Sequence, residues 1–169
     1  MYQLEEYVNY GELGVCQITA VGKMPGLDSP QLYYTIKPLE HPENTIYLPV
    51  EKANVSASMR RIISREDALH LLEELPAMEI IDHHDRREKQ HMMEKAMKCH
   101  RCEEWCRVLK TLYSSRAQSL ASGRKKGTTE EAMWKTAETC LIGELAFVLG
   151  ESREEVKERL QEALLAAYK

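Results

Sequence analysis

The 169-residue sequence predicts an α+β protein, in which a small antiparallel β module precedes an all-α part of about five helices. Up to Ala53 the apolar residues alternate in short, β-branched runs, a pattern typical of half-buried strands. From Ser64 onward they recur every three or four residues, as they do on one face of a helix. The change predicts a β domain over residues 1–53 and a helical domain over 54–169.

Four runs of strand length lie in the first part, each bounded by turn residues: 7–10, 15–21, 32–36 and 45–49. Pro49 either ends the fourth run or marks it as an edge strand, because proline has no N–H to give to a neighbour. Residues 54–63 are ambiguous, and Met59–Ile63 could form a fifth short strand that closes the module. So small a module is near the lower limit for an independent core, which favours a closed or half-open barrel.

Helix signals then follow in order. Ser64 with Asp67 resembles a capping box and opens a short helix that Pro76 stops. Charged residues from 85 to 98 and a longer run from 101 to 121 form the next two helices. Thr128 with Glu131 caps an amphipathic helix that Gly150 ends, and Ser152 with Glu155 caps the last. The residues expected to face inward are Ala68, Leu71, Leu72, Leu75, Cys102, Cys106, Leu109, Leu112, Tyr113, Trp134, Ala137, Leu141, Leu145, Val148, Val156, Leu160 and Leu164.

The charge distribution separates one segment from the rest. The net charge of −4 argues against a nucleic-acid binder, but residues 82–126 hold 12 basic and 6 acidic side chains while the other segments are acidic. A local basic face on an acidic protein can attract phosphate without binding polyanions everywhere.

No signal-peptide pattern is present, and no apolar run is long enough to span a bilayer. The five cysteines are odd in number and lack the spacing of a disulfide scaffold, which fits a reducing cytosol. We therefore expect a cytoplasmic protein with no membrane partner.

Cysteine and histidine form the cluster that most resembles a chemical site. Cys99, Cys102 and Cys106, with His91 or His100 nearby, could supply four ligands to zinc. Their spacing is also that of a buried helical stripe, and reduced cysteine packs well in cores. The helix periodicity favours core packing, so we predict no metal and no cofactor.

Basic residues and histidines gather at the start of the second helix. His83 and His84 could be a metal pair or a pH switch, but adjacent residues do not share a helix face, which favours a solvated helix start. Arg86, Arg87 and Lys89, continued by Lys95, Lys98 and Arg101, could face a phosphate backbone or simply be a solvated surface. The loop residues Arg124, Lys125 and Lys126 leave the same two alternatives open.

Enzyme motifs are missing from the sequence: it has no phosphate-binding glycine loop, no nucleophile elbow and no zinc-protease helix. Its acidic residues follow helix-capping and surface patterns. We therefore expect a protein that is not an enzyme.

Taken together, the motifs of both parts resemble the CarD/CdnL family of bacterial transcription regulators. Individually weak, they match in order and spacing over nearly the whole chain: Tyr7-Val8-Asn9-Tyr10, Gly14-Val15, Tyr33-Tyr34-Thr35-Ile36-Lys37-Pro38, Ile46-Tyr47-Leu48-Pro49, Met59-Arg60-Arg61-Ile62-Ile63, Leu109-Lys110-Thr111-Leu112-Tyr113 and Ala137-Glu138 with Leu141 and Gly143-Glu144-Leu145-Ala146.

The resemblance implies a Tudor-like N-terminal domain that binds the β subunit of RNA polymerase. It implies a helical domain that contacts promoter DNA, independently of sequence, at the upstream edge of the bubble, and so stabilises the open complex. Strand addition through main-chain hydrogen bonds suits the first contact. We expect a monomer with polymerase contacts at Lys23, Ile46, Tyr47, Leu48 and Pro49, and DNA contacts at His84, Arg86, Arg87, Lys89, Lys95 and Lys98.

Two positions depart from the family pattern. Where well-known members place a tryptophan wedge two residues before an arginine pair, this chain has His84. Where members have polymerase-contacting arginines, it has Tyr47 and either Lys23 or Met24. Two other functions therefore stay open: a Tudor-like interaction module without a DNA role, and a zinc- or redox-responsive regulator that uses the three neighbouring cysteines.

Overall fold

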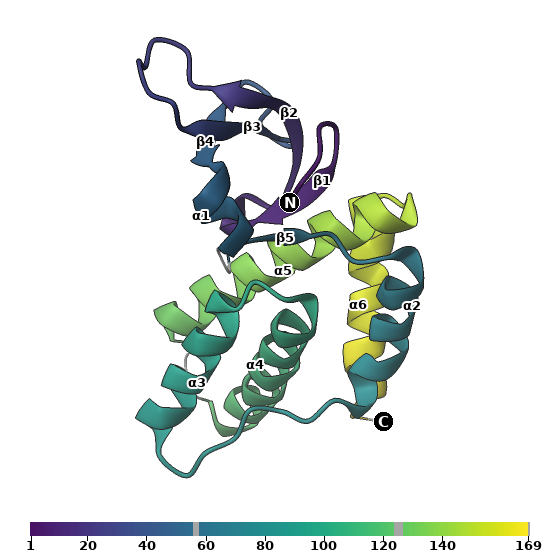
Figure 1. The fold of residues 1–169 in the computed structure, drawn as a ribbon. Helices are drawn as coiled ribbons and strands as arrows, with labels where there is room; N and C mark the ends of the chain where they lie inside the picture. Colours follow the sequence, from purple (N-terminus) through teal and green to yellow (C-terminus); the bar gives the residue numbers. More distant parts are fainter. Residues whose placement is uncertain (56–57, 124–126, 169) are drawn as a thin grey trace. The chain divides into compact units, whose positions relative to one another are not determined.

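The structure, a computed structural model, describes residues 1–55, 58–123 and 127–168. It divides the chain into two units, Met1–Ile62 and Ile63–Lys169, each with its own internal contacts. The α+β prediction is confirmed, because an antiparallel sheet forms the first unit and helices form the second (Figure 1).

The first unit is a five-stranded sheet in the order β4-β3-β2-β1-β5. Its strands are β1 (Tyr7–Tyr10), β2 (Val15–Lys23), β3 (Leu32–Pro38), β4 (Ile46–Pro49) and β5 (Met59–Arg61), and every ladder is antiparallel. The predicted turn after β1 is the short 3-10 helix η1 (Gly11–Leu13), which ends at Gly14 with a positive φ of 75°. The register of β2 against β3 shifts between Ile18 and Ala20, a bulge that bends the long strand β2 (Figure 1).

One face of this sheet carries the core of the unit. On β3 the fully buried Tyr34 and Ile36 alternate with more exposed neighbours, and Val8 of β1 and Cys16 and Ile18 of β2 complete the same core. The short helix α1 (Val50–Val55) adds Val50 and Ala53 to the same core.

The domain boundary lies later than the sequence predicted. β5 pairs with β1 through Val8–Arg61, Asn9–Arg60 and Tyr10–Met59, so the chain up to Ile62 belongs to the first unit. A boundary after Ala53 is too early, because the chain continues through α1 and then returns to the sheet as β5. The possible fifth strand over Met59–Ile63 is present as β5.

The second unit contains five α-helices within the described residues, as predicted: α2 (Arg65–Glu74), α3 (Arg86–Lys98), α4 (Cys102–Ser122), α5 (Thr128–Leu149) and α6 (Arg153–Ala166). The 3-10 helix η2 (Leu75–Ala77) follows α2 at Pro76. The Ser64 side chain caps α2, Ser152 and Glu155 form a full capping box on α6, and Gly150 ends α5 at a positive φ of 66°. The predicted cap at Thr128 is wrong, because Gly127 occupies the N-cap position.

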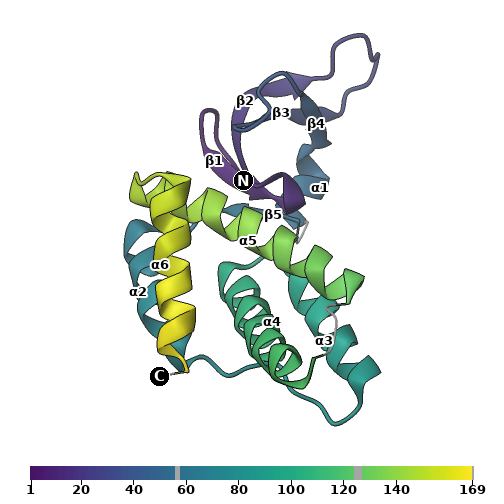
Figure 2. The ribbon, with the colours of Figure 1, turned by 180° about the vertical axis from the view of Figure 1, so that it is seen from behind.

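Helix α5 is the centre of this unit and contacts α2, α3, α4 and α6 (Figures 1 and 2). Of the residues predicted to face inward on α5, Ala137, Leu141 and Leu145 are fully buried. Cys140, Ile142 and Glu144 are buried in addition to Ala137 and Leu141, because neighbouring helices cover several of its faces. Trp134 and Val148, both expected inside, are half-buried.

Candidate functional sites

Strand β4 is one edge of the sheet and carries four of the five residues predicted to bind polymerase. Tyr47 lies opposite Thr35 of β3 and is 36% exposed. Ile46 and Leu48 are half-buried and pack against the core, and Pro49 is half-buried as well. One side of the strand therefore packs against the core of the unit, while Tyr47 presents an aromatic ring to solvent.

Lys23, the fifth predicted residue, does not lie on β4. It is exposed at the end of β2, opposite Leu32, whereas Tyr33 pairs with Pro49. Lys23 and Pro49 are consequently at the same end of the sheet, with β3 between them.

The opposite edge, β5, is covered by the N-terminal residues. The Tyr2 hydroxyl donates to the carbonyl of Met59 at 3.0 Å, and Arg61 donates to the carbonyl of Met1 at 3.3 Å. Arg61 Nε also donates to Glu6 Oε1 at 2.7 Å. Burial alone would raise the pKa of Glu6, but hydrogen bonds from Gln3 N–H and Arg61 outweigh it and lower that pKa. Ionic and hydrogen bonds thus fasten this edge, whereas β4 presents Tyr47.

A second candidate site begins just before α3, where a short network orders the chain. Asp85 caps the helix by accepting from Arg87 N–H at 2.9 Å, and its own N–H donates to His83 Nδ1 at 2.9 Å. The rings of His83 and His84 stack with centroids 4.4 Å apart. His84 is exposed at the residue before the cap. The bond to Nδ1 requires that nitrogen of His83 to be unprotonated.

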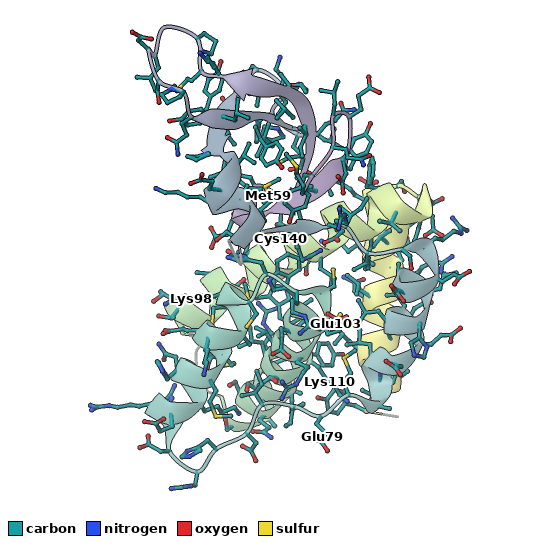
Figure 3. All side chains as sticks on the ribbon, viewed as in Figure 1. Met59, Glu79, Lys98, Glu103, Lys110 and Cys140 are labelled. Carbon is teal, nitrogen blue, oxygen red and sulfur yellow. The ribbon has the colours of Figure 1, made fainter. Side chains whose placement is uncertain are left out.

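Three side chains of α4, among them Lys110 (labelled in Figure 3), hold the segment that leads to α3 by four hydrogen bonds. Lys110 donates to the carbonyls of Pro76 and Met78, and the buried Thr111 hydroxyl accepts from Ile81 N–H at 2.9 Å. Arg107 Nε donates to the carbonyl of Glu79 at 3.3 Å. Burial lowers the pKa of Lys110, and its two carbonyl acceptors favour the charged form. The entry to α3 is thereby fixed although it has no regular structure.

Five of the predicted DNA-binding residues are on α3: Arg86, Arg87, Lys89, Lys95 and Lys98. Within the described part of the chain, none of them forms an ion pair with another side chain. All are exposed except Lys89, which is half-buried. Their charges are therefore free to meet an external anion.

The structure does not bring these cations into one row. Arg86 and Lys89 line a cleft of about 380 Å³ between α3, α4 and α5. Helix periodicity turns Arg87, Lys95 and Lys98 to other sides, and Figure 3 shows Lys98 at the far end of the helix. The predicted loop residues Arg124, Lys125 and Lys126 lie outside the described residues.

Cys99, Cys102 and Cys106 do not form one buried stripe. Cys102 and Cys106 are buried in the core as predicted, but Cys99 is exposed at the end of α3. The chain breaks between α3 and α4 at His100, whose φ of 52° takes Cys99 off the line of α4. Across the described residues, no three His, Cys, Asp or Glu side chains come together as metal ligands would.

Glu144 is a buried acidic residue whose role the sequence did not predict. It is fully buried on α5, where Oε1 accepts from Ile63 N–H at 3.0 Å and Oε2 lies 3.2 Å from Cys102 Sγ. The signal was available, because Glu144 follows Leu141 by three residues and is therefore on the inward side of the helix.

The comparisons identify the first unit. Residues 2–63 match the family model described as the CarD-like/TRCF RID domain. This unit is a CarD-like RNA polymerase-interacting domain. The matched range includes β5, in agreement with the later boundary. No curated protein matches the chain.

A CarD-like domain of this kind is a non-enzymatic interaction module, and it marks the chain as a transcription-related protein that interacts with RNA polymerase. Among the described helices, none is both long and apolar enough to cross a membrane.

Proposed function

We propose that this protein is a bacterial transcription regulator that joins RNA polymerase to promoter DNA and so stabilises the open complex. The CarD-like unit binds the polymerase β subunit, and the helical unit contacts DNA independently of sequence. The protein acts as a monomer in the cytoplasm. The observation that carries the proposal is the exposed edge β4 within a unit that matches a polymerase-interacting family.

Docking of β4 rests on its geometry. A sheet edge can accept a strand of a partner through main-chain hydrogen bonds, while exposed side chains give specificity. Tyr47 supplies a large amphipathic ring in the middle of the strand, of the kind that contributes strongly to interfaces. Lys23 lies at the end of the sheet near Pro49 and would add a charged contact at the rim.

Contact with DNA rests on the charges of α3. Cations without an intramolecular partner release counterions from DNA when they bind it, which gives salt-sensitive affinity with little dependence on sequence. Arg87 lies on the first turn of α3, and His84 precedes the cap. The pinned entry segment keeps both in a defined position relative to α4.

Co-purification with the polymerase β subunit tests the first contact. Tyr47→Glu places a charge on the exposed side of β4 and should abolish retention of the subunit. Leu13→Glu is the matched control, because Leu13 is 42% exposed in the same unit but belongs to the connection between β1 and β2. Equal retention of both variants would remove β4 from the interface.

Salt-dependent DNA affinity tests the second contact. Arg87→Ala should weaken binding about equally on unrelated duplexes and reduce the salt slope by about one. Arg153→Ala removes the same charge from α6, the last helix of the unit, and serves as the charge-matched control. An unchanged slope for Arg87→Ala would leave the chain as a Tudor-like interaction module whose α3 does not touch DNA.

A further inference from the structure

The cleft between α3, α4 and α5 differs from the packing that adjoins it. Antiparallel helices α3 and α4 share a buried seam of Met93, Ala96, Val108 and Leu112 (Figures 1 and 2). Along α4, heptad-like spacing continues that seam from Leu112 to three serines, Ser115, Ser119 and Ser122. The seam is therefore apolar at one end and lined by hydroxyls at the other.

The polar end of the seam is the cleft itself, and its volume of about 380 Å³ is large enough for a small ligand group. Arg86 and Lys89 enter it from α3, and Ser119 and Gln118 enter it from α4. Neither cation pairs with a carboxylate within the described residues. Among the described residues that line the cleft, Glu130 of α5 is the one acidic side chain, which leaves an excess of one positive charge over Arg86 and Lys89.

We propose that this cleft is a seat for a phosphate group, bound by the charges of Arg86 and Lys89 and by hydrogen bonds from Ser119 and Gln118. A guanidinium and an ammonium together neutralise a phosphate, and neutral donors fix its oxygens. The short serine side chains leave room that leucines would fill. The phosphate comes either from a nucleic-acid backbone, in which case the seat rests on the proposed function, or from a free phosphate compound.

A substitution that fills the cleft without changing the charge distinguishes phosphate binding in the cleft from general electrostatic attraction. Ser119→Leu places a bulky apolar side chain in the cleft and keeps every cation. Ala117→Leu is the matched control, because Ala117 is exposed on the same helix and turned away from the cleft. Leucine is a good helix former at both positions, so both variants should fold.

Two measurements on the full chain decide the proposal. The first is the salt dependence of affinity for a duplex, for which Ser119→Leu should lower the slope by about 0.9, the value of one phosphate contact. The second is titration of the free protein with inorganic phosphate, which should shift the amide signals of Ser119 and Thr129 in the parent and in Ala117→Leu but not in Ser119→Leu.

The pattern of results names the source of the phosphate. A change for Ser119→Leu in the duplex measurement assigns the seat to the DNA backbone. Phosphate shifts alone, without an effect on duplex affinity, assign it to a free phosphate compound. If Ser119→Leu matches the parent on DNA and phosphate leaves the cleft amides unmoved, the seat does not exist. The DNA role of Arg87 is measured separately and stands or falls on its own.

Discussion

The carboxylate of Glu144, fully buried on α5, accepts a hydrogen bond from the backbone N–H of Ile63 at 3.0 Å. Ile63 is the first residue of the helical unit, so a side chain from the middle of α5 fixes the point where that unit begins. Arg65 adds a second tie by donating to the carbonyl of Leu149 at 2.8 Å. The helical unit thus holds its own first residues through α5.

Glu144→Ala should lower the free energy of unfolding, because Ile63 N–H and Cys102 lose an acceptor inside the core. An unsatisfied buried donor costs about 1–3 kcal/mol, and the cavity adds to it. Glu144→Gln keeps a carbonyl acceptor and should cost less. Urea unfolding of both, beside exposed Glu158→Ala as a control, measures the difference; three equal stabilities would refute the structural role of Glu144.

Acid should lower the folding stability of the CarD-like unit, because it protonates Glu6. Its pKa is lowered in the folded state, so its stabilising contribution is complete above the ordinary value of 4.5 and is lost as the pH falls through the lowered value. Arg61→Met removes the guanidinium that favours the carboxylate and should flatten this part of the profile. Hydrogen exchange of the Val8 and Cys16 amides between about pH 3 and 6 reports on this unit. If the stability of the parent changes with pH as little as that of Arg61→Met, the Glu6–Arg61 pair does not stabilise this unit.

Thiol labelling should distinguish Cys99 from the other four cysteines. Cys99 is exposed, while burial raises the pKa of Cys16 to about 11 and raises that of Cys106 as well. Iodoacetamide at neutral pH should therefore modify one thiol per folded chain, identified by mass spectrometry. Rapid labelling of Cys102 or Cys106, or stoichiometric zinc lost together with the fold on chelation, would instead support the zinc- or redox-responsive alternative.

His84→Trp should lengthen the lifetime of polymerase–promoter complexes. His84 is exposed beside the first turn of α3, where a larger apolar ring could insert between unstacked base steps. Tryptophan also replaces one ring of the His83 stack with another aromatic ring, so the local packing is retained. Complexes of His84→Trp and His84→Ala that decay at the parent rate would place this residue away from the bubble edge.

Local signals predicted most of the fold. Alternating runs gave the first four strands, and capping residues such as Ser64 and Ser152 gave helix starts, because both depend on neighbours in the sequence. Helix α1 was missed since it is only six residues long and depends on Val50 and Ala53 packing against the sheet. The prediction of the domain boundary was wrong for the same reason.

The sites were harder to predict because they depend on contacts between distant elements. Helix periodicity would have kept Cys99 with Cys102, but a positive φ at His100 separates them. The sequence left open whether the basic residues of α3 face a phosphate backbone or are a solvated surface. In the structure, Arg86 and Lys89 line a cleft whose other walls come from α4 and α5. Sequence spacing along one helix cannot reveal such a cleft.

The lifetime of open promoter complexes tests most directly whether the protein joins polymerase to DNA. Complexes formed with the parent should decay more slowly than those formed by polymerase alone. Tyr47→Glu and Arg87→Ala should each remove most of that effect, since each breaks one of the two contacts, while Leu13→Glu should keep it. An undiminished effect for Tyr47→Glu, or a parent protein that leaves the lifetime unchanged, would contradict this account.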